Sequence, residues 1–278
     1  MRAIIGRDSV GFFEIEDGDG NLTDADSTPT VVMTDWAGDV VAGVSAVTST
    51  GSTGLYQVTI PPLATADRLT VTLTATVGSV VRTYTGFVPV VEGRLAELNQ
   101  LRADSELADL SGYNLMDVSE VVEETIEDIL HFPPTPLVDQ EIFRFRGGRR
   151  MQLPRMRYVD SVLSLEIDGI AYDVDDLEVT GGGIYIADGA SFPSGRVVVW
   201  AVHGPPESWR RGVPGDMRRA ATVLARYTAR TNNYPERARM IQTDGAMLTF
   251  SMASYDRPTG LPEVDGILFR YRVLEAIA

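Results

Sequence analysis

The chain has 278 residues, no cysteine and two histidines, which excludes a disulfide framework, a thiolate metal site, a cysteine nucleophile and a three-histidine metal site. All 24 basic residues are arginine, and 39 acidic residues give a net charge of −15. This balance argues against a dedicated nucleic-acid binder and against docking on an anionic membrane. No apolar stretch approaches the roughly 20 residues that cross a bilayer, and no apolar signal segment follows Met1, so we expect a soluble intracellular product.

Residues 1–92 predict an all-β domain, because short segments alternate apolar and polar side chains and are separated by turn sequences. The predicted strands are Val10–Glu16, Thr30–Thr34, Gly54–Ile60, Leu69–Val77 and Val80–Val90. Short strands at this spacing favour an immunoglobulin-like β-sandwich, with Trp36, Tyr56 and Tyr84 as candidate core aromatic residues.

Asp17, Asp19 and Asn21 have the spacing of the first ligands in a calcium loop of the EF-hand type. That loop needs glycine and glutamate where this chain has Leu22 and Thr28. We therefore predict an Asp-Gly hairpin turn here and no metal site.

Residues 93–278 predict an α+β domain in which helices flank a central antiparallel β region. The helices are expected over 94–103, Met116–Leu130, from Val213-Pro214-Gly215-Asp216 to about Arg230, and Glu263–Arg272. Asp216 is placed to cap the third helix, and Pro133-Pro134 ends the second. The strands are expected over Glu141–Arg146, Met151–Arg157, Val159–Ile167, Ile170–Val174, Ile184–Ala187, Arg196–Val202 and Met247–Met252, with a two-residue hairpin turn at Asp168-Gly169.

Charge is distributed unevenly over this second half. Six acids and no base fall within 117–128, whereas six arginines accompany one acid within 141–157. Two interpretations stay open: solvated faces with intramolecular pairs, or acidic and basic faces that meet between neighbouring subunits of a ring. The candidates for such contacts are Asp117, Glu120, Glu123, Glu124, Glu127, Arg144, Arg146, Arg149, Arg150, Arg218 and Arg219. A transient, non-specific contact with DNA phosphates is a third interpretation of the arginine cluster.

Motifs for catalysis are missing from the sequence, which has no nucleophile elbow, phosphate loop, zinc-protease helix or dinucleotide fingerprint. Gly181-Gly182-Gly183 leads into a predicted strand, so it is interpreted as a loop. His131 ends a helix and His203 ends a strand, positions that favour structural roles. We therefore expect a protein that is not an enzyme and has no cofactor and no metal.

Four segments in chain order resemble the head-to-tail adaptor (head–tail connector) proteins of long-tailed bacteriophages, particularly those of actinobacteria. They are Val122-Glu123-Glu124-Thr125-Ile126-Glu127 with Phe132-Pro133, Leu153–Val162 with Ile167–Tyr172, Val213–Ala221, and Thr259–Arg272. Together they span about residues 94–272. Gly54–Pro62 and Leu69–Val77 resemble the immunoglobulin-like domain that some actinophage adaptors carry before the connector core.

The resemblance implies a structural virion protein with an immunoglobulin-like sandwich over 1–92 and a connector core over 93–278. Such adaptors form a ring, here expected to be dodecameric, beneath the portal protein in the neck of the virion, after assembly in the host cytoplasm. The ring would bind the next neck protein on its other side and let genomic DNA pass. A C-terminal apolar stripe would either dock into a portal groove or pack in its own subunit. It comprises Leu261, Val264, Ile267, Leu268, Tyr271 and Leu274.

Two other functions remain as alternatives from the sequence. The sandwich would suit a tail or baseplate module that binds carbohydrate or a host surface, if an aromatic platform around Trp36 were exposed. A hydrolase that uses a pair of acids is the other, although no particular pair stands out in the sequence.

Overall fold

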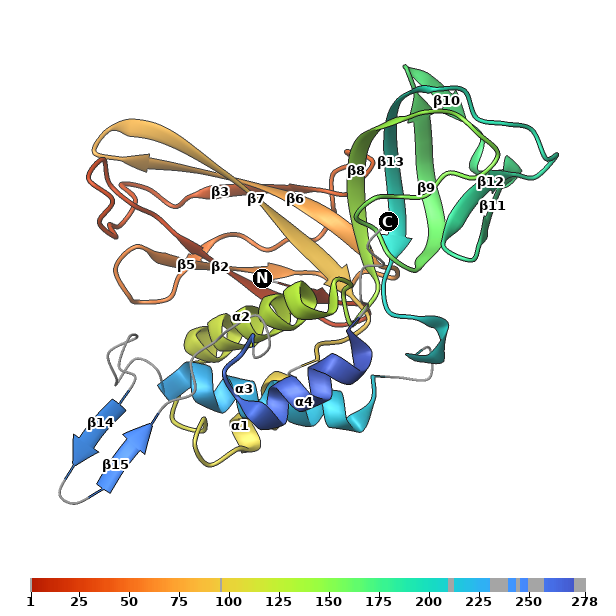
Figure 1. Ribbon diagram of the computed structural model, residues 1–278. Helices are drawn as coiled ribbons and strands as arrows, with labels where there is room; N and C mark the ends of the chain where they lie inside the picture. The colour runs from red at the N-terminus through yellow and green to blue at the C-terminus, as the bar shows by residue number, and fades with distance from the viewer. Residues whose placement is uncertain are drawn as a thin grey trace. The chain divides into compact units, whose positions relative to one another are not determined.

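The computed structural model describes residues 2–95, 97–209, 213–230, 240–243, 246–249 and 258–272. The protein is rich in β-structure, and four α-helices lie within the described residues (Figure 1). Contacts divide the chain into two compact units: Met1–Gly93 with Pro136–His203, and Arg94–Thr135 with Gly204–Ala278. Each unit is described separately below.

The first unit begins with two sheets that enclose a shared core. One sheet has the strand order β1-β7-β6-β3 and the other β2-β5-β4, and all neighbours are antiparallel except β1 and β7. The strands are β1 (Ala3–Ile4), β2 (Ser9–Glu14), β3 (Thr30–Thr34), β4 (Thr48–Ser49), β5 (Leu55–Ile60), β6 (Asp67–Val77) and β7 (Val80–Val91). All five strands predicted from the sequence here are present, while the two-residue β1 and β4 were not predicted.

Alternation in β6 explains how these sheets pack. Leu69, Val71 and Leu73 are buried, and the threonines between them are half-buried, as a strand with one face on the core requires. Val58 and Ile60 of β5 join Leu69 and Val71 in one cluster, so both sheets contribute to the same core. Among the predicted core aromatics Tyr56 is buried, whereas Trp36 and Tyr84 are half-buried.

The acidic segment at Asp17 is a hairpin turn, as predicted. Asp17 Oδ1 accepts hydrogen bonds from the backbone N–H groups of Asp19 at 2.8 Å and Asn21 at 3.0 Å. These bonds lower the pKa of Asp17, because they stabilise its ionised form. Glu16 and Leu22 pair across the turn, so the Asp17 carboxylate is used in closing it.

The rest of the first unit is a second β region with its own core. Its antiparallel sheet has the order β10-β9-β13-β8, and a two-stranded sheet pairs β11 with β12. The elements are β8 (Leu137–Phe145), β9 (Val159–Ile167), β10 (Ile170–Tyr172), the 3-10 helix η1 (Val174–Asp176), β11 (Leu177–Thr180), β12 (Gly183–Ile186) and β13 (Gly195–His203). The predicted turn at Asp168-Gly169 is confirmed: Ile167 pairs with Ile170, and φ is 50° at Asp168 and 84° at Gly169.

One predicted strand in this region is wrong. Residues 151–157 form no strand; Met151 alone makes an isolated bridge to Ile184, and Leu153 and Met156 fill the core from an irregular segment. These three side chains are therefore buried without a ladder of hydrogen bonds. The sequence also failed to indicate β11, where only Leu177 and Val179 pack against the core.

The second unit is a helical cluster. It contains α1 (Leu98–Ala103), α2 (Gly112–Leu130), η2 (Glu207–Trp209), α3 (Gly215–Arg230) and α4 (Pro262–Tyr271). The α2 helix begins four residues before its predicted start, because the Ser111 side chain accepts a hydrogen bond from Asn114 N–H at the N-cap. It ends at His131, which adopts the left-handed conformation with φ of 61°.

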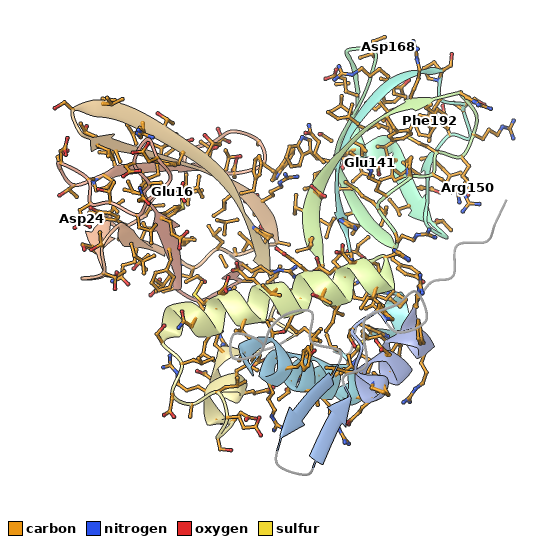
Figure 2. All side chains as sticks on the ribbon, turned by 60° about the vertical axis from the view of Figure 1, so that its left-hand side comes forward. Glu16, Asp24, Glu141, Arg150, Asp168 and Phe192 are labelled. Carbon is orange, nitrogen blue, oxygen red and sulfur yellow. The ribbon has the colours of Figure 1, made fainter. Side chains whose placement is uncertain are left out.

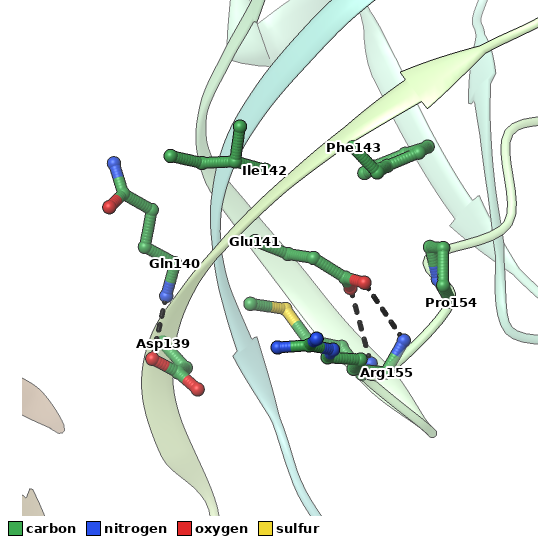
Figure 3. A pocket seen from close by; sticks show the side chains of 8 residues that line it. Asp139, Gln140, Glu141, Ile142, Phe143, Pro154 and Arg155 are labelled. Atoms are coloured by element: carbon green, nitrogen blue, oxygen red, sulfur yellow. Dashed lines mark hydrogen bonds between the residues drawn. The ribbon is translucent and has the colours of Figure 1, made fainter.

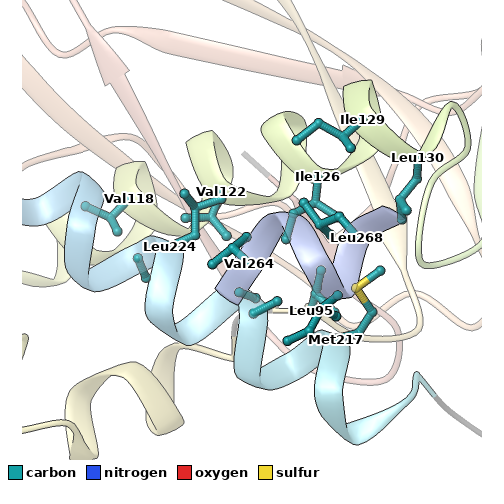
Figure 4. Close-up of a cluster of buried hydrophobic side chains, with 14 of the residues drawn as sticks. Leu95, Val118, Val122, Ile126, Ile129, Leu130, Met217, Leu224, Val264 and Leu268 are labelled. Carbon is teal, nitrogen blue, oxygen red and sulfur yellow. The ribbon is translucent and has the colours of Figure 1, made fainter. Parts of the chain in front are cut away.

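Facing side chains of α2, α3 and α4 make the core of this unit (Figure 4). Val122 and Ile126 of α2, Leu224 of α3 and Leu268 of α4 are among its buried members. The buried side chains of β8, β9 and β13 belong to a different cluster. The helices therefore pack on one another around a core of their own.

Contacts group the chain in a way that its order in the sequence does not show. A boundary near residue 92 coincides with the end of β7 at Val91. Residues 136–203 cluster with the N-terminal strands, however, and 94–135 cluster with 204–278. The helical unit is thus built from two stretches of chain that are separated by the second β region.

A short hairpin is formed by β14 (Met240–Thr243) and β15 (Ala246–Thr249). The strand predicted over Met247–Met252 coincides with β15 as far as Thr249, and its remaining residues lie outside the described residues.

Gly54 provides a test of the first unit's packing. Gly54 and Gly6 both have φ of +70°, but a Cβ atom on Gly54 would lie 2.8 Å from Thr23 N and 2.9 Å from Ile15 O, whereas one on Gly6 would meet nothing within 4 Å. We expect Gly6→Ala to cost about 1 kcal/mol of unfolding free energy from backbone strain. Gly54→Ala should cost at least about 1 kcal/mol more, because backbone atoms must move. Denaturant unfolding of both variants measures the difference, and equal losses would contradict the packing described.

Candidate functional site

The C-terminal apolar stripe lies in the core of the helical unit. Val264, Ile267 and Leu268 are at most 6% exposed, and Leu261 and Tyr271 pack half-buried against the same cluster. Leu274 lies outside the described residues. The described part of the stripe therefore packs in its own subunit, which is the second of the two alternatives, and docking into a portal groove stays an untested prediction. An amphipathic helix shows the same apolar spacing in both situations, so the sequence could not separate them.

Polar contacts hold α4 in this position. The Tyr271 hydroxyl donates to the Asp216 carboxylate in the first turn of α3, with O···O distances of 2.9 and 3.1 Å. Burial and this hydrogen bond both raise the pKa of Tyr271. Asp265 is 2% exposed and accepts hydrogen bonds from the backbone N–H and the hydroxyl of Thr259. Asp216, predicted as a helix cap, thus lies inside α3 and binds α4.

Part of the acidic character of α2 is turned inward. Glu123 is fully buried, and its Oε1 accepts the backbone N–H of Leu95 at 2.7 Å. Arg94 is 5% exposed, donates to the Ser119 hydroxyl at 3.3 Å and lies 3.9 Å from Glu120 Oε1. Glu123 therefore serves the interior of this subunit, whereas the Glu120 side chain is 23% exposed beside Arg94.

The remaining acids of α2 lie on its outer side. Asp117, Glu124 and Asp128 are exposed, and Glu127 is half-buried. Positions seven and eleven residues apart fall on one side of a helix, so the three exposed acids form a single stripe. Val121, which is 41% exposed, lies within this stripe.

The arginines of the second β region are held at the surface by a fixed loop. Arg144, Arg146, Arg149 and Arg150 are all exposed, and Figure 2 labels Arg150 among them. Gly148 and Phe192 exchange two backbone hydrogen bonds of 3.0 and 2.9 Å, and Met151 and Ile184 exchange two of 2.9 and 2.8 Å. These paired bridges lie on either side of Arg149 and Arg150, so the loop presents both side chains from a defined backbone.

The arginines of α3 are used differently. Arg218 and Arg219 are both exposed, as a role between subunits requires. Arg219 lies 2.6 Å from Glu263 of α4, so this pair ties two helices of one subunit together. A pair as exposed as this one contributes little stability, about 0–1 kcal/mol.

Glu141 is the one acid within 141–157, and its side chain is buried. Its carboxylate accepts hydrogen bonds from the backbone N–H groups of Arg155 at 2.9 Å and Met156 at 3.3 Å (Figure 3). A pocket beside it is lined by Asp139–Phe143 and Pro154–Met156. The carboxylate thus fixes the irregular segment that follows the arginine loop. It does not neutralise the exposed guanidinium groups.

The histidines have structural surroundings. His131 ends α2, and its backbone N–H donates to Glu127 O at 2.8 Å. His203 at the end of β13 is 8% exposed, and burial lowers its pKa, although nearby Asp139 acts in the opposite direction. Within the described residues no group of three or more histidine, aspartate or glutamate side chains could hold a metal ion, and no helix is long and apolar enough to cross a bilayer.

The sandwich does not offer a free tryptophan platform at Trp36. The rings of Trp36 and Trp200 lie 6.1 Å apart and are tilted by 47°. The Arg68 guanidinium covers the Phe87 ring at 4.3 Å and lies 5.8 Å from that of Trp200, and Arg68 pairs with Asp139. A sugar-binding platform needs an accessible aromatic face; the Trp36 ring is half-buried beside Trp200, whereas Phe87 is 56% exposed although Arg68 lies over its ring.

Comparison with known proteins identifies no relative. No protein-family model matches the chain, and no curated protein matches it.

Substitution of the adjacent residues Glu123 and Glu124 tests whether the buried Glu123 carboxylate stabilises the protein. Glu123→Ala should destabilise the protein by about 2–3 kcal/mol, because it removes a charged hydrogen bond and leaves the Leu95 N–H buried without its acceptor. Glu124→Ala, on the exposed side, should change the unfolding free energy by less than about 0.5 kcal/mol. Urea unfolding followed by circular dichroism measures the unfolding free energy of both variants. An unchanged unfolding free energy in Glu123→Ala would contradict the structural role of the buried Glu123 carboxylate.

His203 predicts a loss of stability in acid. Its pKa is lowered in the folded state, so below the ordinary value of 6.5 the unfolded chain binds a proton that the folded chain rejects. Between about pH 7.5 and about pH 5.5 this should cost on the order of 1 kcal/mol. His203→Leu should lose that part of the pH dependence, whereas His131→Asn at an exposed position should keep it. Unfolding midpoints at the two pH values measure this difference. An identical pH dependence in His203→Leu and the wild type would refute the assignment of the loss of stability in acid to His203.

Proposed function

We propose that this chain is a structural virion protein, the head-to-tail adaptor of a tailed bacteriophage, which forms a ring beneath the portal protein. The observation that carries the proposal is the presence of two exposed surfaces of opposite charge on one chain. The outer side of α2 carries Asp117, Glu124 and Asp128, and the loop after β8 carries Arg149 and Arg150. The ordered resemblance of four segments to adaptor proteins supports the same assignment.

A ring joined by two different surfaces is a heterologous assembly, in which each copy uses both surfaces once. Single exposed ion pairs are weak, at about 0–1 kcal/mol, but a closed ring repeats each contact in every copy. Such an assembly needs charged side chains on both surfaces that form no ion pairs within their own subunit. The ring number expected from the resemblance is twelve, and it belongs to the proposal.

The fold supports a division of labour within the proposed adaptor. We assign the paired sheets β1-β7-β6-β3 and β2-β5-β4 to an immunoglobulin-like domain, because two facing antiparallel sheets of short strands enclose one core. The helices and the second β region are assigned to the connector core. The buried acids Glu123, Glu141 and Asp265 each accept backbone hydrogen bonds, which gives them structural work in place of catalysis.

The net charge fits a conduit for DNA. With a net charge of −15, the chain repels phosphate overall, so DNA can pass the lumen of the proposed ring without binding tightly. The proposed partners are further copies of the chain, the portal protein, the next neck protein on the tail side and, transiently, the genomic DNA.

Reconstitution tests the proposal. The purified protein, alone and mixed with the portal protein of the same phage, should form closed rings that are visible by electron microscopy and remain with the portal on size exclusion. Raising the salt concentration should weaken the rings, because exposed charges are screened. A protein that stays monomeric in both conditions and shows no portal affinity would refute the proposal.

A further inference from the structure

The outer face of the β8–β13 pair places two arginines directly opposite each other. Arg144 on β8 is the register partner of Arg196 on β13, and both are exposed. Like charges in this position repel, so a sheet gains nothing from them by itself. Neither guanidinium forms an ion pair within the part of the chain that the structure describes. The nearby Asp168 carboxylate accepts the backbone N–H of Arg196 at 2.8 Å.

The same face has an apolar centre. Ile142, two residues before Arg144, is the partner of Val198 and is 51% exposed. Val198 is half-buried, and Glu166 of β9 lies beside it as a carboxylate of this face. The opposite face of the sheet, with Val197 and Val199, fills the core. The outer face is therefore a basic surface around an exposed isoleucine, which we call the basic sheet face.

The outer stripe of α2 has the complementary pattern. Asp117, Glu124 and Asp128 surround Val121, which is 41% exposed. The stripe from Asp117 to Asp128 is about 16 Å long, close to the length of about five residues of a strand such as β8. We call it the acidic helix stripe. Acids beside a valine on one surface match two arginines at one end of an isoleucine on the other.

We propose that the acidic helix stripe of one copy packs against the basic sheet face of a second copy, with Val121 beside Ile142. The inference rests on the proposed ring and specifies its contact. Both surfaces are exposed in the folded chain, so neither is already used in its own subunit. A DNA backbone would neutralise the arginines but would leave Ile142 without an apolar partner, which favours a second copy as the occupant.

A charge swap tests this contact. Arg144→Glu with Arg196→Glu, and separately Asp117→Arg with Glu124→Arg, should each weaken self-association at least about tenfold. The protein carrying all four substitutions should recover to within about threefold of the wild type, because the charges are exchanged and not lost. Arg7→Glu with Arg102→Glu, at exposed positions outside both surfaces, is the matched control and should associate normally. Sedimentation velocity of the full chain, with and without the portal protein, gives the readout.

The outcomes separate this contact from the proposed function. If the wild type and both charge-reversed variants form rings equally well, the contact is wrong and the adaptor function stands. If the reversed variants lose association and the four-site variant does not recover, the two surfaces do not meet and the contact is wrong. If Arg144→Glu with Arg196→Glu loses only the binding of a labelled DNA duplex, the basic sheet face binds phosphate instead. If the wild type forms no ring even with portal, both proposals fall.

Discussion

The helical unit depends on burying one carboxylate. Glu123 lies on the apolar side of α2 with no exposed surface, where an ionised group is costly unless hydrogen bonds satisfy it. The Leu95 N–H supplies one such bond, and Arg94 is buried on the same side of the helix against Ser119. The chain just after the last strand of the first sheets is thereby fixed to α2. The helix then presents Val122 and Ile126 to α3 and α4.

The charged side chains fall into those used inside the subunit, such as Glu123, and those left at its surface. Glu123, Glu141 and Asp265 satisfy backbone donors inside the protein, and Arg219 pairs with a neighbouring helix. Among the charges that remain, exposed acids form a stripe on the outer side of α2, and exposed arginines gather at Arg144, Arg146, Arg149 and Arg150 of the second β region, which also carries exposed acids elsewhere. Two local surfaces of opposite charge orient a contact between copies, although each single exposed ion pair contributes little free energy.

Local patterns predicted most elements, and failures occurred where a pattern has two physical explanations. The alternation of β6 and the Asp168-Gly169 turn depend on neighbouring residues alone, and both were predicted correctly. Residues 151–157 carry apolar side chains at Met151, Leu153 and Met156, yet they fill the core without pairing as a strand. Glu123 looked like any other acid of α2, since its burial depends on Leu95, far away in the sequence. The pairing of Arg144 with Arg196 needed the strand register, which composition does not contain.

The discontinuous origin of the helical unit has a consequence for biosynthesis. Its core needs Val122 of α2 and Leu268 of α4, and residues 136–203, which belong to the other unit, are synthesised between them. During translation α2 can pack against α3 once both have been synthesised. Their shared apolar surface stays uncovered until α4 has been synthesised. A prematurely terminated product that lacks α4 would expose that apolar surface and present it to chaperones and proteases. Synthesis through α4 is therefore needed before the core of the helical unit is complete.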